Sequence, residues 1–170
     1  MAAEAEADIE RQVDRDLAAG VRDVVQIAGR VRRLVVHGAG DDLLVFDAGS
    51  GLSRLREEPF RQLVPSSDRP IHIVLTHLHF DHIIGLTFLA ALWKNPTHVH
   101  VPRGDRGADG TRADNATMLR SLFGGPLFPI PFDELLPQIS LDPMDGSPLV
   151  LGGIRITSLP QAHPGGSAGY

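Results

Sequence analysis

A short stretch of the sequence contains four side chains of the kind that bind divalent metals. In residues 71–85, IHIVLTHLHFDHIIG, an apolar run is followed by His77, His79, Asp81 and His82. Neutral imidazole nitrogens and carboxylate oxygens are the ligands that zinc and similar ions accept, at about 2.0–2.2 Å. Four such groups at the mouth of a buried strand are costly to desolvate unless something binds them. The stretch therefore predicts a metal site.

The elements on either side of this stretch must position the four side chains. The β-branched, apolar residues 71–75 predict a buried strand. If the backbone stays extended beyond it, His77, His79 and Asp81 project to the same side. A helix is expected over residues 82–93, which are apolar nearly all round and should pack between layers. Asp81 would stand at the start of this helix, and His82 would lie in its first turn. Their side chains could then reach a point next to the one that His77 and His79 share. This suggests two neighbouring metals.

Plainer interpretations exist for the single residues. Asp81 could serve only as a helix N-cap, which is a common role for Asp. His98 and His100 lie on one side of a second expected strand, THVHV, without a third ligand nearby. We interpret this pair as structural, because two histidines on a strand are a weak signal for a metal site.

The spacing His77-x-His79-x-Asp81-His82 is similar to the signature of the metallo-β-lactamase superfamily of metal-dependent hydrolases. The form HLHFDHIIGL further resembles the branch that includes ribonuclease Z and related phosphodiesterases. The last residues, HPGGSAGY, resemble the next motif of that branch, in which a histidine after a strand is followed by a glycine-rich turn. The resemblance therefore implies that His163 completes a three-imidazole site.

The resemblance also draws attention to an aspartate upstream. Asp47 ends an apolar strand and is followed by Ala-Gly-Ser-Gly. An Asp in a turn has a plain explanation, because its side chain bonds readily to the local backbone. In the superfamily an aspartate at this place lies near the metal pocket, which makes Asp47 a candidate to orient a ligating imidazole through its far nitrogen.

The implied fold is α/β, the four-layer αβ/βα sandwich of the metallo-β-lactamase type. The resemblance covers about residues 24–170, which would form the first sheet, its helices and part of the second sheet. The family continues with a metal-bridging aspartate and a further histidine ligand, and neither is found before Tyr170. We therefore expect a fragment of a longer protein, with the C-terminal part of the fold missing. Residues 1–22 are expected to be a charged extension, helical or frayed, and residues 23–170 the incomplete metallo-β-lactamase-like domain.

The implied function is hydrolysis by a metal-activated hydroxide. The intact protein would hold two divalent metals, zinc or else manganese, and this chain supplies a full ligand set for only one of them. Asp81 would bind the second metal and orient the nucleophile. A phosphodiester of nucleotide or RNA type is the expected substrate. The alternatives are hydrolysis of a thioester or lactone, and a truncated metal-binding remnant without catalysis.

Composition limits the remaining possibilities. The chain has 170 residues, 42% of them apolar, and no cysteine, so any metal is held by His and carboxylate groups. A net charge of −5 disfavours tight binding to a long nucleic acid and leaves small anionic or nucleotide-type partners open. No segment reaches the length of a membrane span and the first twenty residues lack a signal-peptide core, so a cytoplasmic location is expected. A homo-oligomer is possible.

Overall fold

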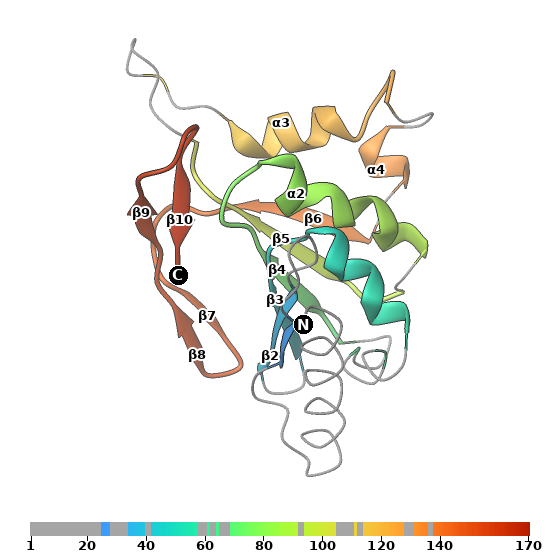
Figure 1. The fold of residues 1–170 in the computed structure, drawn as a ribbon, viewed down its shortest axis with the longest axis horizontal. Coiled ribbons are helices and arrows are strands. Elements are labelled where there is room, and N and C mark those ends of the chain that lie inside the picture. Colours follow the sequence, from blue (N-terminus) through green and yellow to red (C-terminus); the bar gives the residue numbers. More distant parts are fainter. Residues whose placement is uncertain are drawn as a thin grey trace, which may run out of the picture.

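A six-stranded mixed sheet forms the centre of the protein, as the computed structural model in Figure 1 shows. The structure describes residues 25–27, 34–39, 42–57, 61, 64, 69–91, 94–104, 111, 114–127, 131–135 and 138–170. The expected extension over residues 1–22 lies outside this part. The strands, in their order across the sheet, are β1 (Val25–Ile27), β2 (Leu34–Ala39), β3 (Asp42–Phe46), β4 (Ile71–Val74), β5 (Thr97–Val101) and β6 (Ile139–Pro143).

The direction of these strands brings distant loops to one edge of the sheet. β1, β2 and β3 are antiparallel neighbours, whereas β3, β4, β5 and β6 run parallel. Phe46 pairs with Val74, and Val74 pairs with His100, so the carboxyl ends of the parallel strands are level with one another. The loops that follow β3, β4 and β5 therefore start side by side, where open α/β sheets commonly place ligands.

Helical segments connect the parallel strands and cover one face of the sheet. Within the described residues, the 3₁₀ segments and α-helices are η1 (Ser50–Arg56), α2 (Phe80–Ile83), η3 (Ile84–Ala91), α3 (Asn115–Leu122) and α4 (Phe132–Leu135). The helix expected over residues 82–93 thus begins two residues earlier, at Phe80, and tightens to 3₁₀ geometry at Ile84. No helix in the described part of the chain has the length and hydropathy needed to cross a membrane.

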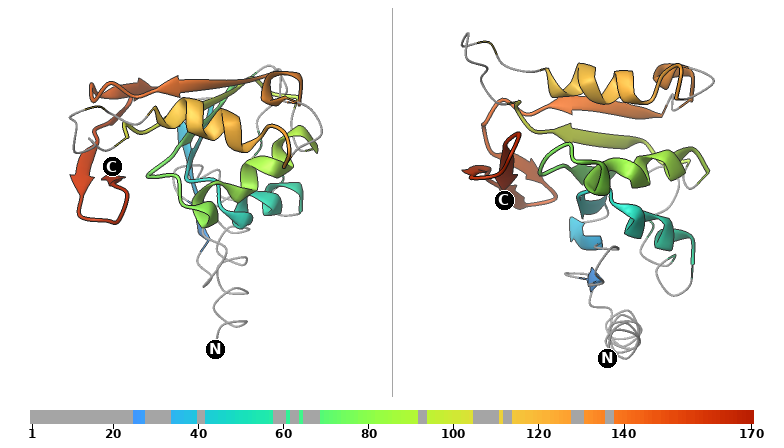
Figure 2. Two further views of the ribbon diagram at one scale, coloured as in Figure 1. Left: turned by 90° about the horizontal axis from the view of Figure 1, so that it is seen from above. Right: turned by 45° about the horizontal axis from the view of Figure 1, so that its top comes forward.

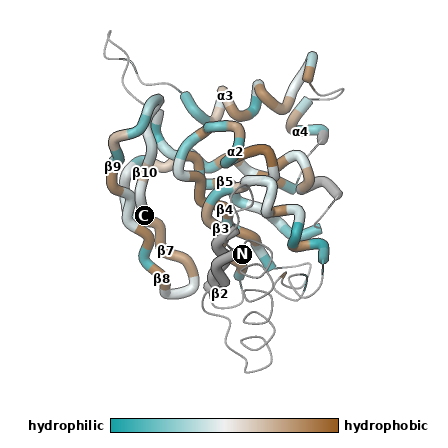
Figure 3. The backbone as a smooth tube through the Cα atoms, viewed as in Figure 1, coloured by the Kyte–Doolittle hydropathy of each residue, from teal (hydrophilic) through white to brown (hydrophobic). Residues whose placement is uncertain are grey.

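The apolar core divides between the two faces of the sheet because side chains alternate along each strand. On the helical face Val45, Ile73 and Val99 pack against helix residues such as Leu52 and Leu86. Leu44, the neighbour of Val45 in β3, faces the other side of the sheet and belongs to a second, smaller apolar cluster. Figure 3 shows the hydrophobic residues gathered on the central strands and on the helical segment that follows α2.

Two small hairpins lie on the opposite side of the sheet from the helices, which the two views of Figure 2 make clear. β7 (Leu149–Leu151) pairs with β8 (Ile154–Ile156), and β9 (Leu159–Gln161) pairs with β10 (Ser167–Gly169). The β7–β8 hairpin contributes to the second apolar cluster, together with Leu44. The loop between β9 and β10 carries the sequence motif that contains His163.

Candidate metal centre

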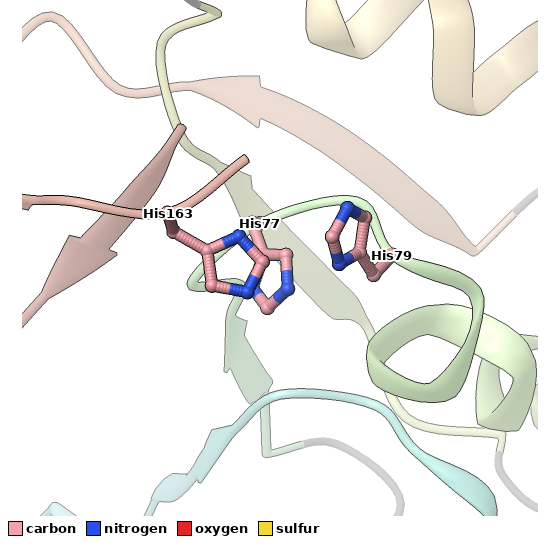
Figure 4. Close-up of side chains that lie close together, drawn as sticks. All are labelled: His77, His79 and His163. Atoms are coloured by element: carbon pink, nitrogen blue, oxygen red, sulfur yellow. The ribbon is translucent and has the colours of Figure 1, made fainter. Parts of the chain in front are cut away.

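Three histidines from two separate loops converge in the structure. His77 and His79 follow β4, and His163 lies between β9 and β10. Each offers a ring nitrogen, and the three nitrogens lie within 4.8 Å of one another. The ring centroids are 4.5 Å apart for His77 and His163, and 4.7 Å apart for His79 and His163. Figure 4 shows the three rings gathered around a common point.

A short chain of hydrogen bonds determines which nitrogen of His77 is available. The hydroxyl of Thr76 lies 2.9 Å from Nδ1 of His77 and 2.9 Å from Oδ1 of Asp47. The carboxylate can only accept, so the hydroxyl donates to Asp47 and accepts from the Nδ1–H of His77. The lone pair of His77 is therefore on Nε2, which is buried and has no hydrogen-bond partner among the described residues. A buried acceptor without a partner is costly, and a bound cation would satisfy it.

His163 also uses Nδ1 as a hydrogen-bond donor. Its Nδ1 donates to the carbonyl oxygen of Pro164 at 2.9 Å, which leaves Nε2 with the lone pair. The hairpin that carries it is fastened to the exit of β4, because the amide of Ala168 donates to the carbonyl of Thr76 at 2.9 Å. The hydroxyl of Tyr170 donates to the carbonyl of Leu75 at 2.8 Å. These two bonds place the loop of His163 beside the loop of the other two histidines.

His82 and Asp81 lie next to the three histidines rather than among them. The ring of His82 is 4.2 Å from that of His77, measured between centroids. Its Nε2 is 3.6 Å from Oδ2 of Asp81, whose side chain is 76% exposed. The group of possible ligands within the described residues contains neither of them. Their assignment to a second metal stays a prediction.

Asp47 forms hydrogen bonds to His82 and to Thr76, the residue that precedes His77. Its Oδ2 accepts a hydrogen bond from Nδ1 of His82 at 2.8 Å, and its Oδ1 accepts from the amide and the hydroxyl of Thr76 at 2.7 and 2.9 Å. The backbone of Asp47 has a φ of 61°, a left-handed conformation that Asp tolerates better than most residues. Ala48, the next residue, bonds through its amide to the carbonyl of His82 and through its carbonyl to the amide of Gly85, both at 2.7 Å. The turn after β3 is thereby locked onto the helix that carries His82.

Comparison with known proteins places this geometry in a family. Residues 34–168 match the family model described as the metallo-beta-lactamase superfamily. The chain belongs to this superfamily. No curated protein matches it significantly.

Solved structures agree with the fold. A diphosphatase described as a new member of the PhnP family has a TM-score of 0.55 and 19% identity, over 82% of this chain and 47% of that one. The metallo-beta-lactamase SMB-1 has a TM-score of 0.52 and 16% identity, over 86% and 53%. A mutant metallo-beta-lactamase from Cronobacter sakazakii has a TM-score of 0.52 and 17% identity, over 85% and 53%. The expected family and α/β fold class are confirmed, and the chain spans about half the length of these proteins.

The superfamily consists mostly of metal-dependent hydrolases, and the electrostatics of this site suit a cation. Burial lowers the pKa of His77, and the neighbouring rings of His82, His163 and His79 lower it further, while the Asp47 carboxylate opposes them. The ring is thus kept neutral, which is the form that binds a metal. The donor set, the orphaned Nε2 and the clustered nitrogens all fit a divalent ion.

A cavity of about 440 Å³ opens beside the histidines. Its wall near the metal centre includes Thr76, His77 and His79, together with Gly165 and Gly166 from the loop of the third histidine. Both glycines have a φ of 80°, which side-chain-bearing residues rarely adopt. A Cβ added at Gly165 would lie 4.0 Å from Nε2 of His79, which is an ordinary van der Waals contact. The cavity therefore adjoins the candidate metal centre.

The histidines of β5 form a different cluster. The rings of His98 and His100 both stack on that of His72 from β4, with centroids 5.0 and 5.3 Å away. A 3.1 Å hydrogen bond joins Nδ1 of His72 to Nε2 of His100, and Nδ1 of His98 lies 3.1 Å from Oδ2 of Asp142. These nitrogens are occupied by neighbouring side chains, in agreement with the structural interpretation of the two β5 histidines.

Two contributors to the metal centre were missed by sequence reasoning. Thr76 connects Asp47 to His77, and Tyr170 fastens the loop of His163. The sequence does carry a signal for the first, since a hydroxyl residue stands directly before the histidine whose Nδ1 needs an acceptor. The second depends on how the last hairpin docks, for which the sequence offers no local pattern.

Proposed function

We propose that this chain carries the metal-binding half of a phosphodiester hydrolase. One observation supports it above all: the buried Nε2 of His77 has no hydrogen-bond partner in the described part of the chain and lies in a cluster with ring nitrogens of His79 and His163. These three residues hold one divalent ion, zinc by preference and manganese as the alternative. Asp81 and His82 supply part of the ligand set of a second ion in the intact protein.

The side chains around the ions have separate tasks. A divalent ion bound here supplies Lewis acidity and lowers the pKa of water. The Asp81 carboxylate, 76% exposed beside His82, would orient the attacking water. Thr76 and Asp47 hold the rings of His77 and His82 in the tautomer whose Nε2 carries the lone pair. The chain thereby prepares the donor atoms before any ion arrives.

The substrate is a small, anionic phosphodiester of nucleotide type. The forms HLHFDHIIGL and HPGGSAGY support it, because both resemble the ribonuclease Z and phosphodiesterase branch. An arginine, Arg103, lines the same cavity as His77 and His79, which favours an anion over a neutral lactone or thioester. The protein works in the cytoplasm.

Metal binding is tested first, by titrating zinc and manganese into the EDTA-treated protein with calorimetric detection. The wild type should bind zinc, and His79→Ala should weaken binding by more than about 100-fold because it removes a direct ligand. His98→Ala is the matched control, since His98 lies outside the cluster and bonds to Asp142. Equal zinc affinity in the wild type and the His79 variant would refute the site.

Substrate class is tested next, with bis(p-nitrophenyl) phosphate beside a panel of lactones and thioesters, each with zinc and with manganese. Turnover of the phosphodiester that is lost in His79→Ala supports the proposal. Turnover of a lactone or thioester alone would replace it with ester chemistry at a carbonyl. Tight zinc binding without turnover of any substrate would identify a metal-binding protein without catalysis.

A further inference from the structure

The cavity has a second polar feature besides the histidines. Arg103 follows β5, whose carboxyl end lies at the same edge of the sheet as that of β4. Its side chain lines the cavity together with His77 and His79. A ligand that fills the cavity therefore touches both the metal centre and this guanidinium. The proposed reaction uses the charge of Arg103 only as an argument for an anionic substrate, and it does not say which group of that substrate the guanidinium binds.

The backbone binds the guanidinium of Arg103 through Nε, and this leaves the two terminal nitrogens available to a ligand. Nε of Arg103 donates to the carbonyl of Met144 at 3.3 Å. The terminal nitrogens lie beside Gly146, where an added Cβ would come 3.8 Å from Nη1, and the φ of 94° at that position favours glycine. Within the described residues no ion pair occupies these nitrogens.

The carboxylate of Asp145, which lies close enough to feel the charge of Arg103, is hydrogen-bonded to another residue. Asp145 follows Met144 in the loop that holds the guanidinium, and its Oδ1 accepts a 2.7 Å hydrogen bond from the amide of Ser147. Hydrogen bonds from Ser147 lower the pKa of Asp145 most, and the charge of Arg103 adds a smaller effect. The carboxylate therefore feels the arginine without forming an ion pair with it. An anion in the cavity does not have to displace an internal partner of Arg103.

Part of the remaining wall of the cavity is apolar. Met118 and Leu159 both line it, and their side chains are 55% and 67% exposed. Large apolar side chains open to a cavity are typical of a surface that receives the apolar body of a ligand. The ligand that fits has three parts: a reacting group at the histidines, an apolar or aromatic body on Met118 and Leu159, and an anion at Arg103.

We propose that Arg103 binds a phosphate group of the substrate other than the one that is hydrolysed. A planar guanidinium with two free N–H directions pairs with phosphate through two parallel hydrogen bonds, which a Lys cannot reproduce. The substrate class is then a phosphodiester with an additional terminal phosphate, such as a short 5′-phosphorylated oligonucleotide. The preference for cleaving such a substrate, the catalytic half of this inference, rests on the proposed function. The binding of a phosphate by Arg103, the binding half, does not.

The catalytic half is tested with two dinucleotides that differ only in one phosphate, pApA and ApA, in the presence of zinc. The wild type should prefer pApA in kcat/KM by about 10- to 100-fold, the range expected for hydrogen bonds to a charged group. Arg103→Gln should bring this ratio close to one, mainly through KM, and Arg103→Lys should keep part of it. Arg155→Gln is the matched control, because Arg155 is exposed on β8 and does not line the cavity.

The binding half needs no metal and no turnover. AMP and adenosine are titrated into the EDTA-treated protein at about pH 8, where an ordinary histidine is neutral. AMP should bind about 10-fold or more tightly than adenosine, and Arg103→Gln should abolish the difference. If AMP binds through Arg103 but neither dinucleotide is cleaved, the phosphate site stands and the proposed reaction fails. If ApA is cleaved and Arg103→Gln changes neither the pApA preference nor AMP affinity, the reaction stands and the phosphate site is refuted.

Discussion

Acid should destabilise this protein through His100 before its carboxylates are neutralised. The side chain of His100 is only 7% exposed and packs on the ring of His72. Burial lowers the pKa of His100 to about 4, and the charge of His72 adds to this, while Asp142 opposes it. The charge of His98, whose ring centroid is 6.4 Å from that of His100, lowers it further. The pKa of His72 is lowered too, by burial and by His98, against the opposing charges of Asp42 and Asp142.

The size of the effect follows from the difference between the folded and unfolded states. In the unfolded chain His100 takes up a proton near its ordinary pKa of 6.5, whereas the folded protein resists protonation until about pH 4. As the pH falls through this window the unfolded state binds more protons, so the free energy of unfolding decreases. Stability is unaffected above about pH 6.5, and His100 alone should remove about 2.5 kcal/mol by about pH 4.5.

The assay is urea unfolding at neutral pH and at about pH 4.5, in EDTA so that metal binding does not contribute. His100→Leu replaces the ring with an apolar side chain and costs about 1 kcal/mol at neutral pH, because the hydrogen bond to His72 is lost. At the acid pH the variant should instead match or exceed the wild type, since it has no proton to take up. The measured quantity is how the difference in the free energy of unfolding between the wild type and His100→Leu changes from neutral pH to about pH 4.5.

A buried neighbour on the same strand provides the control. Thr97 donates a hydrogen bond to the carbonyl of Asn95 at 3.2 Å, and Thr97→Val removes it without removing a titrating group. This variant should be less stable than the wild type by a similar amount at both pH values. The reasoning is refuted if His100→Leu behaves like Thr97→Val, with a parallel loss at both pH values.

Three further substitutions test the packing behind the site. Ile73→Ala should lower the free energy of unfolding in urea by about 2–5 kcal/mol with an unchanged m-value, because Ile73 is fully buried in the larger apolar cluster. Gly85→Ala should cost about 1–3 kcal/mol or more, since the added Cβ would lie 2.7 Å from the carbonyl oxygen of Ala48; wild-type stability would show that the turn can move. Tyr170→Phe removes the hydrogen bond to the carbonyl of Leu75 and should cost about 1 kcal/mol, together with a measurable loss of zinc affinity through the loosened hairpin. An unchanged zinc affinity in that variant would show that the hairpin holds its place without this bond.

Local patterns in the sequence predicted the strand and the ligands that follow it. The apolar run of β4 and the alternating His77 and His79 are separated by only a few residues, so their relation does not depend on the rest of the fold. Asp81 shows where such reasoning stops. The backbone turns into a helix at Phe80, which ends the alternation of the extended chain after His79. Asp81 therefore does not project to the same side as His77 and His79. Its carboxylate instead lies near Nε2 of His82.

The remaining parts of the site depend on contacts between distant segments. His163 is far from His77 in the sequence, and only the resemblance to a known motif joined them before the structure did. Arg103 and Met118 come to the same cavity from the end of β5 and from α3, and neither stands in a recognisable pattern. Composition and periodicity predict burial, but they do not tell which exposed side chains meet across a sheet edge.

A common rule nevertheless connects the histidines from different loops. His77, His82 and His163 each use Nδ1 as a donor, to a threonine hydroxyl, a carboxylate and a backbone carbonyl respectively. A neutral imidazole that donates from Nδ1 carries its lone pair on Nε2, so in the neutral form all three rings share one tautomer. Three different acceptors thus leave the same ring nitrogen available in each histidine. For His77 and His163, which belong to the cluster of possible ligands, this shared tautomer is an argument for metal binding that does not depend on the family to which the chain belongs.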